Sequence, residues 1–80
     1  MSIEKDAEEL HNAMKGVGTD EDKIIKIVAN RTQKQRVAIK DFYQKLYNKE
    51  LADDVKSDIK GDLQKLLLPI VNGTRSKNNN

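Results

Sequence analysis

Apolar residues recur along this chain at intervals of three and four, and no segment alternates between apolar and polar positions as a strand does. The first such set is Ile3, Ala7, Leu10 and Met14. It forms one face of a helix predicted over residues 3–15. Ser2 is the expected N-cap, and Gly16 is placed to end the helix.

A second helix is predicted over residues 20–30, where four apolar residues cluster: Ile24, Ile25, Ile27 and Val28. We expect Thr19 to cap it, because acidic residues 20–22 would then lie in the first turn, where the helix dipole favours negative charge. A third helix, residues 33–47, should begin after Thr32, which is also a good cap.

Two more helices complete the pattern. Leu51, Val55 and Ile59 predict a fourth over residues 50–59, and a fifth should begin at Asp62. Pro69 falls late in the fifth helix and is expected to kink or fray its last turn.

Helices this short are marginal alone, so they must pack on one another. The sequence therefore predicts an all-α fold of five helices, one domain over residues 1–72. Residues 73–80 are polar and are predicted to form a disordered tail.

Composition narrows the classes of function. Fifteen basic and thirteen acidic residues are interspersed, which argues against nucleic acid as a partner. No apolar run is long enough to cross a membrane, and the charged start does not resemble a signal peptide. We therefore expect a cytoplasmic protein.

Catalytic chemistry finds no support in the sequence. Cysteine is absent, so there is no thiolate for catalysis or zinc, and the single histidine has no second histidine with which to build a zinc site. His11 falls on the polar side of the first helix and is expected to be solvated. No phosphate-cradling glycine motif occurs either, so we expect a protein that is not an enzyme.

The connection between the first two helices has the features of a cation-binding loop. Gly16 and Gly18 stand one residue apart and can adopt dihedral angles that other residues avoid. The carbonyl groups of Met14, Gly16 and Gly18 could then converge on one point. Calcium accepts such oxygens readily, because it is a hard cation that takes six to eight of them.

A doubly charged ion also needs a carboxylate, and Asp58 is the candidate. Asp54 and Asp62 lie four residues before and after it, with no cation at either position. Like charges at that spacing repel mildly, and a bound cation would relieve the repulsion. The alternative is a solvated acidic face with no ligand role.

These residues resemble the endonexin-type calcium site of the annexin family, which reads Gly-x-Gly-Thr, then 38 residues, then Asp or Glu. Here 38 residues separate Thr19 from Asp58. The likeness extends over residues 3–71 and includes Ala-Asn-Arg-Thr at 29–32 and Gly-Asp-Leu-Gln-Lys-Leu at 61–66. The resemblance implies a single annexin repeat, right-handed and superhelical, with four helices in a bundle and the third crossing them.

The same resemblance implies the ligands. The primary calcium ion would be held by the carbonyls of Met14, Gly16 and Gly18 and by the carboxylate of Asp58. A weaker second ion would use the carbonyl of Thr19 and the carboxylate of Glu21.

The family binds acidic phospholipid surfaces through such ions, which implies a cytoplasmic protein that attaches reversibly to the membrane periphery. Lys15 is expected to meet anionic head groups. Val17, at the loop tip, would either touch the interfacial layer or tuck against the domain.

One departure from the family bears on function. Family members commonly carry four repeats, whereas this chain has one, so its membrane avidity should be low. Surface that would meet neighbouring repeats must be exposed, made polar or covered by self-association. The alternative function is therefore a structural or interaction domain, an isolated or engineered repeat without productive membrane binding.

Overall fold

The computed structural model describes residues 2–72, and this part of the chain contains five α-helices and no strand. The helices are α1 (Ile3–Lys15), α2 (Glu21–Ala29), α3 (Gln33–Tyr47), α4 (Leu51–Asp58) and α5 (Gly61–Val71). The predicted all-α fold is confirmed. The predicted tail, residues 73–80, lies outside the described residues.

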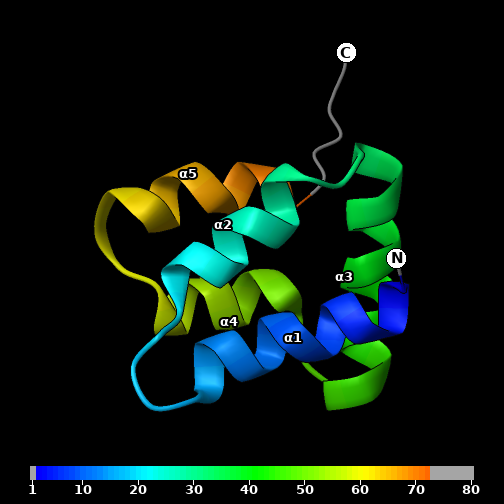
Figure 1. The fold of residues 1–80 in the computed structure, drawn as a ribbon, viewed down its shortest axis with the longest axis horizontal. Coiled ribbons are helices and arrows are strands. Elements are labelled where there is room, and N and C mark those ends of the chain that lie inside the picture. The colour runs from blue at the N-terminus through cyan, green and yellow to red at the C-terminus, as the bar shows by residue number, and fades with distance from the viewer. Residues whose placement is uncertain (1, 73–80) are drawn as a thin grey trace.

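Four helices form a bundle, and the remaining helix crosses one end of it. Figure 1 shows α1, α2, α4 and α5 running in similar directions, with α3 nearly perpendicular to them. α1 packs against α2, α3 and α4, and α4 packs against α5. The third helix therefore crosses the other four, as predicted.

Side-chain caps fix the starts of α1, α2 and α3. Ser2 Oγ accepts the Lys5 backbone N–H at 3.2 Å, and Thr32 forms a reciprocal capping box with Gln35. Both caps were predicted. The prediction that Thr19 caps α2 is wrong, because Asp20 does so through its Oδ1, which accepts the Lys23 N–H at 3.2 Å.

The ends of the later helices differ slightly from the prediction. α4 is one residue shorter at each end, because both Glu50 and Ile59 adopt extended conformations. α5 begins one residue early, at Gly61. Pro69 does not fray α5, which continues to Val71; burial of Val71 holds the last turn on the core.

Among residues 2–72, Tyr43 of α3 is the largest side chain that is fully buried. His11 lies beside it and stacks on Tyr47, with ring centroids 3.7 Å apart and an interplanar angle of 8°. The expectation of a solvated His11 is therefore wrong. The reason is tertiary: α3 crosses α1 and covers the part of α1 that a helix alone would leave in water.

A buried ion pair ties the start of α1 to the connection between α2 and α3. Asp6 is 5 % exposed, and its two carboxylate oxygens accept hydrogen bonds from Arg31 Nε at 2.6 Å and Nη2 at 3.0 Å. Such two-point pairing is the strongest geometry for a carboxylate and a guanidinium. The hydrogen bonds to Asp6 also raise the pKa of Arg31.

Candidate calcium site

The loop between α1 and α2 is held at both ends. The side chain of Met14 is buried at its start, and the Asp20 N–H donates to the Ala13 carbonyl at 2.8 Å at its close. Gly18 has φ +65°, a left-handed conformation that favours glycine. Gly16 is extended, and a Cβ there would lie 3.0 Å from the Asn12 carbonyl oxygen. Both glycines thus serve the loop conformation.

Backbone hydrogen bonds leave the predicted ligand carbonyls free. Those that close the loop use the carbonyls of Asn12 and Ala13. Within residues 2–72, no hydrogen bond recorded for the loop reaches the carbonyls of Met14, Gly16 or Gly18. These three oxygens are available to water or to a cation.

Asp58 lies against this loop although 38 residues separate it from Thr19. The Thr19 hydroxyl donates to the Asp58 backbone carbonyl at 3.2 Å. In Figure 1 the α1–α2 loop and the α4–α5 connection lie at the same end of the bundle. Thr19 therefore fastens the loop to the end of α4 instead of capping α2.

The Asp58 carboxylate is only partly exposed. Its side chain is 21 % exposed, and Oδ2 is buried and accepts no hydrogen bond of regular geometry. The Lys15 ammonium lies 2.7 Å from Oδ2. A buried carboxylate oxygen without a hydrogen-bond donor suits a cation ligand, and here an ammonium faces it.

Lys15 supplies the positive charge near Asp58 that no residue of α4 provides. Helix α4 has none one turn from Asp58, but the last residue of α1 reaches both Asp58 and Asp54, at 3.4 Å from Asp54 Oδ1. The pKa of Lys15 is raised, chiefly by the close contact of its ammonium with the Asp58 carboxylate and further by the charge of Asp54.

Asp54 was missed as a member of this cluster. It is 3 % exposed, and the Tyr43 hydroxyl donates to its Oδ2. Burial and this hydrogen bond raise the pKa of Tyr43 far above its usual value. The signal was present in the sequence: Asp54 lies three residues after Leu51 and beside Val55, on the apolar face of α4.

The remaining predicted residues lie on or beside the loop. Val17 is the most exposed large apolar side chain among residues 2–72 and does not tuck against the domain. Thr19 is half-buried, and Glu21 is exposed in the first turn of α2. Across residues 2–72, no three acidic or histidine side chains converge into a metal cluster. A cation here would therefore take most of its ligands from the backbone.

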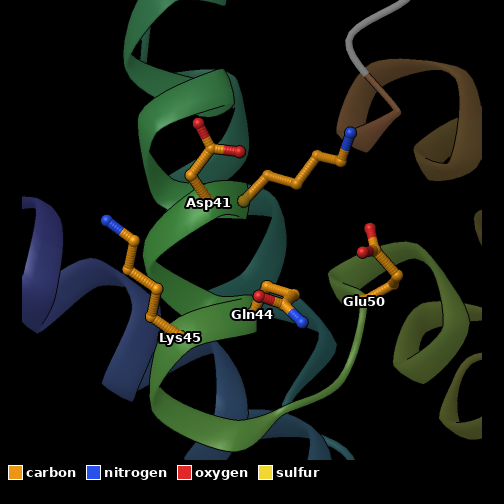
Figure 2. Close-up of a pocket in the computed structure, with 5 residues that line it drawn as sticks. Asp41, Gln44, Lys45 and Glu50 are labelled. Carbon is orange, nitrogen blue, oxygen red and sulfur yellow. The ribbon is translucent and has the colours of Figure 1, made fainter.

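A separate hollow lies along α3, away from these residues. Figure 2 shows Gln44 of α3 and Glu50, which precedes α4, on one side of the helix and Lys45 on the other. Lys40 and Asp41 complete the lining. Basic and acidic side chains are mixed here, so the hollow has no electrostatic preference for an anion or for a cation.

Comparison with known proteins identifies the family. The annexin family model matches residues 5–70. The chain belongs to the annexin family. It is 42 % identical to human annexin A13 over 71 residues and 47 % identical to horse annexin A1 over 72 residues. These matches cover 89 % and 90 % of this chain but only 22 % and 21 % of those annexins.

Solved annexin structures have the same fold. Chicken annexin V superposes with a TM-score of 0.84 at 38 % identity, over 89 % of this chain and 22 % of that one. A calcium-bound annexin, (Sm)1, gives a TM-score of 0.83 at 47 % identity, over 88 % of this chain and 20 % of that one. The chain is thus one annexin repeat and spans about a fifth of its relatives' length.

Calcium-dependent phospholipid binding is typical of annexins, which are generally not enzymes. Among residues 2–72, no helix is long and apolar enough to cross a membrane.

Proposed function

We propose that this annexin repeat binds calcium at the α1–α2 loop and attaches through that ion to acidic phospholipid surfaces. One observation supports the proposal most strongly: the loop after α1 and the end of α4, each with some of the expected ligands, lie next to each other. The loop offers carbonyl oxygens at Met14, Gly16 and Gly18 that accept no hydrogen bond within residues 2–72. The hydrogen bond from the Thr19 hydroxyl to the Asp58 backbone carbonyl, at 3.2 Å, supports Asp58 as the residue that would add the carboxylate.

The donor set suits calcium better than softer ions. Carbonyl and carboxylate oxygens are the ligands calcium prefers, whereas histidine and cysteine, which favour zinc, are missing from the loop. One carboxylate leaves the ion with uncompensated charge and open coordination positions. A lipid phosphate oxygen can fill such a position, so ion and membrane would each strengthen the binding of the other.

A second, weaker ion would be held by the carbonyl of Thr19 and the carboxylate of Glu21. Glu21 is exposed at the start of α2, which leaves it free to reach an ion near Thr19. An exposed site with one carboxylate would be occupied only at high calcium concentration.

Two residues on or beside the loop are suited to the lipid surface. Val17 projects fully into solvent and would enter the interfacial layer. Lys15 would meet anionic head groups, at about 1 kcal/mol for a basic residue near such a surface. We therefore propose a cytoplasmic protein that attaches reversibly to the membrane periphery, and we propose for it neither a catalytic role nor a nucleic-acid partner.

Removal of the carboxylate tests the site directly. Asp58→Asn should weaken calcium binding about tenfold or more, because the ion loses its one charged ligand. Isothermal titration calorimetry measures the affinity, and Asp41→Asn, the same change at an exposed position of α3, is the matched control. Equal affinity of Asp58→Asn and the natural chain would remove Asp58 from the site.

The alternative function is an interaction domain, favoured by exposed apolar side chains. Leu66 of α5 is 61 % exposed, and Ile25 of α2 is 40 % exposed. Neighbouring repeats or a second copy could cover them. Self-association by sedimentation equilibrium, together with no heat on calcium titration, would favour this function over membrane binding.

A further inference from the structure

The Lys15 ammonium lies beside Asp58, where calcium would bind in the proposed site. We propose that its ammonium is an intramolecular competitor of calcium: it neutralises Asp58 when the ion is absent, and calcium must displace it to bind. This inference rests on the proposed function and concerns the regulation of the same site.

The contacts that carry it are specific. Lys15 Nζ lies 2.7 Å from Asp58 Oδ2 and 3.4 Å from Asp54 Oδ1. Oδ2 of Asp58 is buried, and this ammonium is the charged group that faces it. The ammonium thus faces a carboxylate oxygen that is sheltered from water and, among residues 2–72, accepts no hydrogen bond of regular geometry.

Electrostatics makes the two cations exclusive. Asp54 and Asp58 lie one turn apart on α4, so their negative charges repel and a positive charge between them is favourable. A calcium ion at Asp58 would lie within a few ångströms of the ammonium, and a double and a single positive charge at that distance repel strongly. Calcium binding therefore requires Lys15 to leave Asp58.

Asp54 positions the lysine without being a loop ligand. The Tyr43 hydroxyl donates to its other oxygen and holds the carboxylate in the core. The Lys15 side chain, by contrast, is 35 % exposed, so it has a path to solvent. Once displaced, its ammonium, at the end of α1 and beside the loop that carries Val17, would become available to an anionic head group. Calcium entry would thereby release the lysine that assists lipid contact.

The test compares calcium affinity in the absence of lipid. Lys15→Met removes the competing charge and should tighten calcium binding about three- to tenfold, as expected for loss of a partly exposed ion pair. Lys15→Gln should do the same, whereas Lys15→Arg, which keeps the charge, should bind no more tightly than the natural chain. Lys34→Met, at an exposed position in the first turn of α3, is the control and should leave the affinity unchanged.

The outcomes separate this inference from the proposed function. If the natural chain binds calcium and neither neutral variant gains affinity, competition is overturned while the calcium site stands. If only the neutral variants bind calcium, the lysine excludes the ion and the inference is supported. If none binds, both are overturned.

A second measurement needs no variant. The side-chain ¹⁵N resonance of Lys15, followed by NMR in the natural chain, should move on calcium addition toward that of exposed Lys34. A resonance that stays unchanged at calcium saturation would overturn the displacement.

Discussion

Two aspartates are buried in the described part of this fold, and each is compensated by partners from other parts of the chain. Asp6 is paired with Arg31, and Asp54 with Tyr43 and Lys15. Loss of Arg31 would leave the Asp6 carboxylate in the core without its charge partner, which costs far more than an exposed pair contributes. Loss of Tyr43 or Lys15 would leave Asp54 with one partner instead of two. Both aspartates fall on apolar faces of their helices, but their partners come from other helices, so only the burial could be predicted.

The raised pKa of Tyr43 gives a testable prediction about the pH dependence of stability. Burial and its hydrogen bond to Asp54 raise its pKa above the value of about 10 expected in the unfolded chain. A raised pKa contributes stability that is complete below the unfolded value and lost as pH rises toward the folded one. The free energy of unfolding should therefore fall above about pH 10.

Tyr43→Phe should reduce that alkaline loss, because the titrating group is gone. Its removal should also lower stability at pH 7 by about 1–3 kcal/mol, since Asp54 loses a donor. Urea unfolding at pH 7 and at alkaline pH measures both effects. The loss should shrink without vanishing, because the pKa values of Lys15 and Tyr47 are raised too. An unchanged alkaline loss would contradict this role for Tyr43.

At the scale of elements, local chemistry predicts the helices well and their ends less well. The bounds of α1 and α3 follow from periodicity and from caps at Ser2 and Thr32. The start of α2 does not, because Thr19 and Asp20 are both good caps and only the tertiary contact to Asp58 decides between them. The two halves of the candidate site could be named from the sequence through a family spacing, but Lys15 beside Asp58 could not.

The loop conformation gives a prediction for Gly18. Its φ of +65° is strained for residues with a side chain, although a Cβ would meet no atom within 4 Å. Gly18→Ala should therefore cost about 1–2 kcal/mol through the backbone alone. Gly18→Asn should cost less, because asparagine tolerates the left-handed region. Urea unfolding ranks the variants; an alanine variant as stable as the natural chain would show that the loop does not need this conformation.

At the scale of the whole molecule, one repeat would offer one calcium-binding face under the proposed function. Its relatives are about five times longer, so they can present several such faces to one membrane. Binding through several linked sites at once multiplies avidity, and a chain with a single site lacks this effect. Membrane attachment by this chain should therefore need more calcium than attachment by a protein with several competent sites.

Co-sedimentation with vesicles tests the central claim most directly. The chain should pellet with phosphatidylserine vesicles in calcium on the order of 1 mM, the range of weak calcium modules, and stay in the supernatant with a chelator. It should not pellet with phosphatidylcholine vesicles, and Asp58→Asn should abolish the calcium-dependent fraction. Equal pelleting with calcium and with chelator would contradict a calcium bridge between this loop and the membrane.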